Sequence, residues 1–300
     1  DRSDEDYDIV SIPLDGSAPS ALMATSRREY SPSWSAAGDR MAFVTDRLGP
    51  SEVWIRSRDG AWEKRILSPA DLPGEPEALI LAVALSADGK KTAFLAQSPK
   101  SGSKLWVAPV DGGRPVPAFP DVEREIGIPG WSPDGTWLAS FIVREGNREL
   151  AVIRPGDADS LRILCRDRTH LAACPCWSPD GRWIASGNHD LIHLFAADGT
   201  AERTLRAGVN IQSDEGGLCW SADGAAVLVA TTDAAGSRLD RVDVASGRQK
   251  RIAGLPPSFA LRGPAGFLQS ACLDPVTGAF TTSARALKSD LWILDGFPAL

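Results

Sequence analysis

One five-residue pattern, Trp-Ser-Pro-Asp-Gly, constrains the fold of this chain more than any other feature. It is complete at 131–135 and 177–181, and weaker versions stand at four other places, with successive spacings of 43 to 53 residues. Proline presets the backbone for a turn, aspartate bonds its own backbone, and glycine accepts a positive φ. We therefore expect tight turns at Trp34–Gly38, Leu85–Gly89, Trp131–Gly135, Trp177–Gly181, Trp220–Gly224 and Leu273–Gly278.

The stretch 172–199 shows a whole repeat unit of short strands and turns. We expect one strand ending at Trp177, two more over Arg182–Ser186 and Leu191–Phe195, and turns at Gly187–Asp190 and Asp198–Gly199. A single sheet of three or four such strands cannot bury both of its faces. The unit therefore needs neighbours of its own kind, and the repeats supply them.

A repeat of this length that contains only strands predicts an all-β fold, the β-propeller, in which four-stranded blades surround a central channel. The chain begins inside a unit, because 8–16 fits a third strand and Ser20–Ala24 fits a fourth. Its last strand, Asp290–Leu294, fits a third strand again.

A ring of blades must close to remove its exposed strand edges. We therefore expect the N-terminal strand to complete the C-terminal blade, with Ser20–Ala24 paired to Asp290–Leu294. This arrangement predicts one propeller domain over 1–300, as part of a longer chain, with six four-stranded blades. Seven blades are the alternative, if residues upstream of Asp1 supplied two more strands.

The turn pattern, the apolar strand after it and the third strands that end in Asp-Gly resemble the PD40, or TolB-like, repeat of the WD40-like β-propellers. Thr45–Gly49 resembles the Ser-Asp-Arg-x-Gly link of that repeat, and Ser289–Phe297 looks like the end of propellers attached to sensor kinases and CadC-like winged-helix regulators. The resemblance implies a sensor or binding ring in the periplasm, which such a kinase or regulator could extend. It assigns no catalytic residues, and fold alone does not give function.

Loops that vary on a repeated scaffold are where recognition is usually placed. If the first strands run down the channel, the Ser-x-Asp-Gly turns lie at one end, the bottom, and the links that precede first strands lie at the top. We expect a protein segment or small-molecule ligand at the top mouth, bound by Arg28, Glu29, Tyr30, Glu125, His170, Asp214, Glu215 and Arg262. The alternative is that these side chains only solvate the rim and pair with one another.

Charge and missing motifs argue against several classes of function. A net charge of −7 speaks against a nucleic-acid partner. No apolar run approaches the roughly 18 residues of a membrane-inserting helix, and both Gly-x-Ser-x-Gly and the phosphate loop are absent. We expect a non-enzymatic domain with no catalytic residue, cofactor or metal. The alternative is a hydrolase or lyase that uses top-face carboxylates and His170, with a metal.

The five cysteines, an odd number, make no disulfide framework. Cys174 and Cys176 would share one face of a strand near His170, but no second ligand pair has a spacing suited to a metal. We expect Cys174, Cys176, Cys219 and Cys272 to be buried near the channel wall and unpaired, as small apolar side chains.

All ten tryptophans stand at repeated positions, and four of them, Trp34, Trp131, Trp177 and Trp220, end first strands. Such rings could stack on sugars or bases. Their regular place in the repeat favours packing between blades instead.

Overall fold

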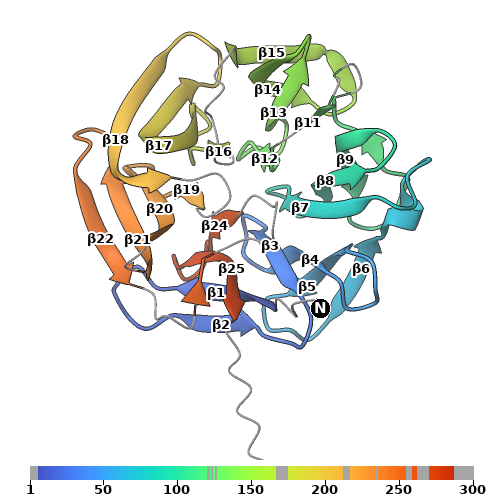
Figure 1. The fold of residues 1–300 in the computed structure, drawn as a ribbon, viewed down its shortest axis with the longest axis horizontal. Coiled ribbons are helices and arrows are strands. Elements are labelled where there is room, and N and C mark those ends of the chain that lie inside the picture. Colours follow the sequence, from blue (N-terminus) through green and yellow to red (C-terminus); the bar gives the residue numbers. More distant parts are fainter. Residues whose placement is uncertain are drawn as a thin grey trace, which may run out of the picture.

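A computed structural model describes residues 6–119, 122, 124–125, 127–166, 175–211, 217–233, 236–254, 259–261 and 270–286. Within these residues the strands form six sheets that radiate around a central axis (Figure 1). The one helical segment there is a 3-10 turn, Pro69–Asp71. The prediction of an all-β propeller with six blades is therefore confirmed. Among the helical segments of the described part, none is long and apolar enough to cross a membrane.

The blades are numbered here in chain order, each from its innermost strand outward. Blade 1 holds β3 (Glu29–Trp34), β4 (Arg40–Thr45), β5 (Glu52–Ser57) and β6 (Glu63–Leu67). Blade 2 holds β7 (Leu79–Leu85), β8 (Lys91–Ser98), β9 (Gly102–Pro109) and β10 (Val116–Pro117). Blade 3 holds β12 (Gly130–Trp131), β13 (Leu138–Arg144), β14 (Asn147–Arg154) and β15 (Asp157–Arg166), and β11 (Arg124–Glu125) also pairs with β13.

The remaining blades follow the same order. Blade 4 holds β16 (Cys176–Trp177), β17 (Trp183–Ala196) and β18 (Glu202–Ile211). Blade 5 holds β19 (Leu218–Trp220), β20 (Ala226–Asp233), β21 (Gly236–Asp243) and β22 (Gln249–Gly254). Blade 6 holds β24 (Ala271–Leu273), β25 (Phe280–Ala286), β1 (Tyr7–Ile12) and β2 (Ser20–Met23), and β23 (Phe259–Ala260) also pairs with β25.

In blade 4 the second and third strands form one continuous element, β17. The backbone N–H of Ala197 donates to the carbonyl of Arg182 at 3.0 Å, so the two ends of β17 lie side by side and the segment folds back on itself. The predicted reversal over Gly187–Asp190 is therefore confirmed, although it lies within one continuous element and is not a separate turn. His189 pairs with Ile211 of β18, so strand pairing continues through the reversal.

The predicted turns have the expected hydrogen bonds. In blade 4 the Ser178 hydroxyl donates to Asp180 at 2.6 Å and accepts the N–H of Trp183 at 2.9 Å. Asp180 also accepts the N–H of Arg182 at 3.0 Å, and Gly181 has a φ of +71°. The hydroxyl of Ser178, followed by the N–H of Arg182, lowers the pKa of Asp180. The carboxylate is therefore part of the turn.

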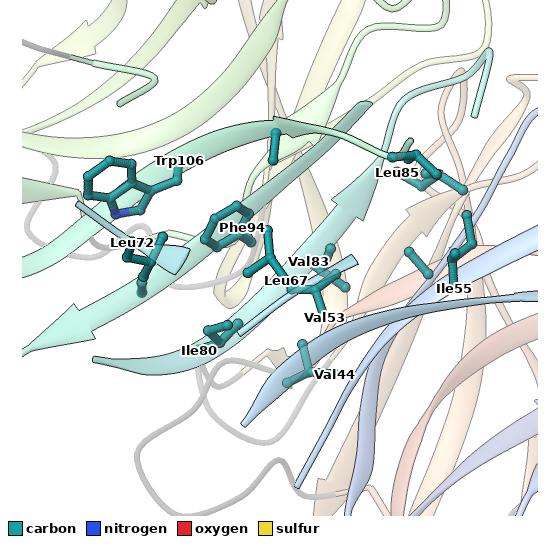
Figure 2. Packing of buried hydrophobic residues seen from close by; sticks show 14 of the residues in the cluster. Val44, Val53, Ile55, Leu67, Leu72, Ile80, Val83, Leu85, Phe94 and Trp106 are labelled. Atoms are coloured by element: carbon teal, nitrogen blue, oxygen red, sulfur yellow. The ribbon is translucent and has the colours of Figure 1, made fainter. Parts of the chain in front are cut away.

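The hydrophobic core lies between blades, in six clusters of buried side chains that each join two neighbours. Figure 2 shows the cluster between blades 1 and 2, where Val44 and Val53 share one core with Phe94 and Trp106. Full burial of a side chain of this size stabilises the fold by about 1.5–3 kcal/mol. Each blade is therefore held mainly by its two neighbours.

Tryptophan side chains add a directional bond to these interfaces. The indole N–H of Trp131 donates to the carbonyl of Ala84 at 3.1 Å, and that of Trp177 donates to the carbonyl of Gly130 at 3.0 Å. Trp220 donates in the same way to Cys176, at 3.0 Å. Each bond runs from one blade to the innermost strand of the preceding blade. The prediction that these rings join blades is confirmed.

The ring closes through β1. Its residues Tyr7–Ile12 pair antiparallel with β25 from Arg285 to Phe280, and β2 pairs with β1. The prediction that Ser20–Ala24 would lie against Asp290–Leu294 is wrong for Ser20–Ala24, because this segment pairs with β1. The third-strand position beside β25 is occupied by β1, so β2 takes the fourth position. Residues 290–294 lie outside the described residues.

The joint between blades 6 and 1 depends more on polar contacts than the joint between blades 1 and 2. Among the described residues its cluster has four buried apolar side chains, against sixteen between blades 1 and 2. Trp34 donates its indole N–H to the Thr281 hydroxyl at 3.2 Å. Arg58, whose guanidinium carbon lies 4.3 Å from the Trp34 ring centre, donates two hydrogen bonds to Asp274, one of them at 2.9 Å. An ion pair between a buried carboxylate and a partly exposed arginine thus ties the last blade to the first.

Asp274 occupies the turn position that serine fills in the other five blades. Burial alone would raise the pKa of Asp274, but the Arg58 guanidinium and the N–H groups of Val276 and Thr277 lower it to about 2. A carboxyl whose pKa falls on folding stabilises the folded state above its unfolded pKa, and this contribution disappears as the pH drops through the folded pKa.

We expect Asp274→Asn to lower the free energy of unfolding at pH 7 by about 2 kcal/mol, from a shift of nearly two pKa units. The difference from the unmodified protein should shrink as the pH falls from about 4 towards 2. Urea unfolding over this pH range measures it. Asp111→Asn is the control, because Asp111 forms an exposed ion pair with Lys64 at 3.1 Å. Equal stability of the two variants would contradict the role of Asp274.

Candidate functional site

The innermost strands of the six blades surround the axis of the ring (Figure 1). They enclose a cavity of about 410 Å³, which we call the axial cavity. Its bottom mouth is formed by the third residue of each turn pattern, which is alanine or proline: Ala36, Ala87, Pro133, Pro179, Ala222 and Pro275. Above them lie Trp34, Leu85, Trp131, Trp177, Trp220 and Leu273. The next layer consists of Ser33, Ala84, Gly130, Cys176, Cys219 and Cys272.

Close packing explains why small residues occupy the layer above the tryptophans. A Cβ on Gly130 would come within 2.5 Å of the Pro175 carbonyl oxygen of the next blade. Such a contact is not tolerated, so only glycine fits there. The innermost strands approach one another through small side chains, and the space that remains along the axis is the cavity.

The wall of the axial cavity is mostly apolar, with four serines among its described lining residues. Among the described residues that line it, none carries a charged side chain. The indole N–H groups of Trp131, Trp177 and Trp220 are hydrogen bonded to backbone carbonyls. The rings therefore contribute apolar surface to the wall and leave no indole donor for a ligand.

Three cysteines occupy equivalent positions in blades 4, 5 and 6. Cys176, Cys219 and Cys272 are thiols, and all three line the cavity. Burial, and then the neighbouring Cys176 and Cys272, raise the pKa of Cys219. Burial raises the pKa of Cys272 to about 12. The prediction of thiols at the channel wall is confirmed for these three, although only Cys219 is fully buried. Cys174 lies outside the described residues.

The top-mouth residues expected from the sequence do not form one exposed site in the described part of the chain. Glu29 and Tyr30 begin β3 and are buried, so their expected exposure on the rim is wrong. Arg28 is half-exposed and lies 3.8 Å from the Asp46 carboxylate. Glu125 lies in β11, opposite Ile142. His170, Asp214, Glu215 and Arg262 fall outside the described residues.

Tyr30 and Glu29 are buried for different reasons. The Tyr30 hydroxyl donates to the carbonyl of Ile80 in blade 2 at 2.8 Å, and burial raises its pKa well above the usual range. Glu29 accepts the Thr25 hydroxyl at 2.7 Å and lies 3.8 Å from the Arg47 guanidinium. Burial still raises the pKa of Glu29. The Tyr30 side chain therefore belongs to the joint between blades 1 and 2, and the Glu29 side chain is held by contacts at the top of blade 1.

The described part of the chain offers no metal centre. Within it, no group of three or more histidine, cysteine, aspartate or glutamate residues is placed to hold a metal ion. His193 is buried in β17, with its Nδ1 3.3 Å from the Glu202 carboxylate and its ring stacked on Phe195. These contacts give His193 a structural role within blade 4.

Sequence reasoning missed the axial cavity, although its signal is visible in the repeats. Each turn pattern begins with Trp or Leu, the residue before the pattern is small, and the third residue of the pattern is alanine or proline. These three positions coincide with the layers of the cavity wall. Attention to polar loop residues, which differ between repeats, led away from this regular apolar pattern.

Comparison with known proteins supports the fold. No protein-family model and no curated protein matches the chain. A solved structure described as a TolB of Agrobacterium tumefaciens is similar, with a TM-score of 0.66 and 18% identity over 98% of this chain and 99% of that one. TolB from Acinetobacter baumannii has a TM-score of 0.58 and 13% identity, over 93% of this chain and 64% of that one.

Enzymes share the same architecture. An oligogalacturonate lyase in complex with manganese has a TM-score of 0.52 and 14% identity, over 77% of this chain and 66% of that one. At these identities the likeness shows the fold alone. The chain therefore has a TolB-like propeller fold, and that fold carries both binding proteins and enzymes.

The reactivity of the cysteines tests the description of the cavity wall. We expect all five to react with a thiol reagent after denaturation without reductant, and few to react in the native protein. Cys219 should be the slowest of the cavity thiols, because the thiolate is the reactive form and burial raises its pKa. Timed alkylation followed by peptide mass spectrometry measures this order. Rapid labelling of Cys219, or fewer than five thiols after denaturation, would contradict the prediction.

Proposed function

We propose that this chain, a six-bladed ring with a TolB-like fold, is a non-enzymatic binding domain that takes a protein segment or a small ligand on the propeller axis. The observation that carries the proposal is the axial cavity, which all six innermost strands line. Its volume, about 410 Å³, falls in the range of about 300–1,000 Å³ that ligand pockets occupy. The lack of charged side chains among the described lining residues favours binding over acid–base chemistry.

The ends of the channel suit different tasks in this proposal. The top mouth would receive a protein segment through loop residues, of which Arg28, Asp214 and Glu215 are the best placed by sequence. The bottom mouth, ringed by alanine and proline, opens into the apolar cavity. The PD40-like repeats also favour a place in the periplasm, where such a domain would act as a sensor.

A hydrolase or lyase remains the alternative function. Such an enzyme would need a metal or a pair of carboxylates on the top face, and no observation in the described residues favours one. Metal analysis of the purified protein addresses this alternative. A bound ion in a 1:1 ratio would support the enzyme and count against the proposal.

Affinity capture with three variants tests whether the axis binds the partner. Asp214→Ala with Glu215→Ala changes the top mouth, and Ala222→Arg puts a charge at the bottom mouth. Lys250→Ala with Arg251→Ala is the control, because these exposed residues lie on the outermost strand of blade 5. Tyr30 stays unchanged, because its hydroxyl is bonded in the core.

We expect one of the two mouth variants to weaken capture at least tenfold, which corresponds to about 1.4 kcal/mol of binding free energy, while melting stays unchanged. The outer-edge control should bind as well as the unmodified protein. Loss of capture by the control alone would move the binding surface off the axis and overturn the proposal.

A further inference from the structure

We infer that the bottom face binds an arginine side chain from an extended segment of a partner protein, in the groove between blades 3 and 4. We call this groove the side groove. It has a volume of about 350 Å³, and its described lining includes Pro133, Asp134, Pro179 and Ala197. The groove lies between two blades and not on the axis, so the inference goes beyond the proposed function.

The joint between blades 6 and 1 shows how an arginine fits such a groove. Arg58 belongs to the hairpin between β5 and β6, and its guanidinium lies over the Trp34 ring. It donates to the Asp274 carboxylate of the preceding blade, and its Nε donates to the Gly38 carbonyl. One guanidinium thus combines stacking on an aromatic face with hydrogen bonds from its planar donors.

Ala197 takes the place of this arginine in the joint between blades 3 and 4. The backbone N–H of Arg58 donates to the Asp39 carbonyl at 2.9 Å, and that of Ala197 donates to the Arg182 carbonyl at 3.0 Å. Each acceptor directly follows the glycine of its turn, so the two hairpin positions are equivalent. A methyl group fills little of the space that an arginine side chain takes, and Ala197 lines the side groove.

The same hairpin position carries a larger apolar side chain in two other blades. The N–H groups of Val110 and Val244 make the equivalent hydrogen bonds, at 2.8 and 2.9 Å. Val110 is buried in the cluster between blades 1 and 2, and Val244 packs against the cluster between blades 4 and 5. These joints fill the position with the protein's own side chain, whereas Ala197 leaves room for a ligand.

The space beside the turn glycines differs in the same way. A Cβ on Gly38 would lie 2.9 Å from an Arg58 nitrogen, whereas a Cβ on Gly181 would meet only the Pro133 ring, at 3.7 Å, among the described residues. Gly181 itself lines the side groove. A guanidinium therefore has room at this turn.

The side groove offers an aromatic ring and a carboxylate at equivalent places. Trp177 ends the innermost strand of blade 4, as Trp34 does in blade 1, and it lines the groove. In the described part of the chain no arginine or lysine lies over the Trp177 ring. Ser132 replaces Asp274, and its hydroxyl is bonded to the Asp134 carboxylate, which brings a negative charge to that position.

The charge of the groove favours a cation. Its described lining holds the carboxylates of Asp134, Asp180 and Asp198 and one guanidinium, that of Arg162. A serine or threonine hydroxyl in each turn lowers the pKa of its aspartate, so all three are ionised at neutral pH. Arg162, on the outermost strand of blade 3, already lies over Trp137, with its guanidinium carbon 4.5 Å from the ring centre. A net negative groove is complementary to a positively charged segment.

Peptide binding to the unmodified protein tests the inference. The probe is the pentapeptide Gly-Ser-Arg-Ser-Gly, acetylated and amidated, and two further peptides carry citrulline or lysine in place of arginine. Citrulline keeps the planar end of the side chain without its charge, and lysine keeps the charge without the plane. We expect the arginine peptide to bind in a 1:1 ratio, at least fivefold more tightly than either of the others, by isothermal titration calorimetry.

A variant that fills the groove locates the site. Ala197→Arg should place the chain's own guanidinium beside Trp177, weaken binding of the arginine peptide at least tenfold and raise the melting temperature by about 2 °C or more. Ala201→Arg is the control, because Ala201 is exposed on the same hairpin and does not line the groove. The control should bind the peptide and melt as the unmodified protein does.

A second pair of variants decides the question if Ala197→Arg does not fold. Asp134→Asn keeps an acceptor for the turn and removes the charge, so it should weaken binding at least fivefold. Asp88→Asn is the matched change in blade 2, where Asp88 accepts the Ser86 hydroxyl at 2.7 Å. It should leave binding unchanged.

Three results would overturn the inference: equal binding of the three peptides, equal behaviour of Ala197→Arg and Ala201→Arg, or equal binding by Asp134→Asn and Asp88→Asn. Self-association of the unmodified protein that Ala197→Arg removes would assign the groove to an arginine of a second copy, and would overturn the partner protein. These outcomes are separate from failure of the proposed function, because Ala222, which that test changes, does not line the side groove.

Discussion

The hydrogen bond from an indole N–H to a backbone carbonyl of the preceding blade is the contact on which the rest of this propeller depends. The innermost strand of a blade pairs with a neighbouring strand on one side only. A carbonyl of such a strand beside an apolar cavity needs a donor, because an unsatisfied buried polar group is costly. Trp131, Trp177 and Trp220 supply that donor. The same bond therefore joins two blades and keeps the channel wall apolar.

The joint between the last blade and the first uses different contacts. Between blades 6 and 1 the apolar cluster is small, and Trp34 donates to a threonine hydroxyl instead of a carbonyl. The Arg58–Asp274 ion pair completes this joint, and the pairing of β1 with β25 joins the N-terminal segment to the last blade. The joints between blades 1 and 2 and between blades 2 and 3 rely instead on larger apolar clusters.

The repeat pattern predicted the fold well because turn chemistry is local. Ser178, Asp180 and Gly181 set their turn through contacts within six residues, so the pattern alone could identify it. Ring closure was harder to predict, because Tyr7–Ile12 and the predicted strand Asp290–Leu294 both fit a third strand by sequence, and sequence does not rank two candidates for one edge of β25. Tyr30 was misjudged for a related reason. Its burial comes from Ile80, fifty residues away, and a loop-like local sequence carries no trace of that contact.

The most direct test of the account is the stability of Trp177→Phe, measured by urea unfolding beside Trp62→Phe. Phenylalanine keeps an aromatic ring but removes the indole donor to Gly130 together with part of the ring that packs between blades 3 and 4, whereas Trp62 is exposed directly before β6, the outermost strand of blade 1. We expect Trp177→Phe to lower the free energy of unfolding by about 1–3 kcal/mol, and Trp62→Phe to change it by less than about 0.5 kcal/mol. Equal stability of the two variants would show that the indole bonds do not hold the blades together.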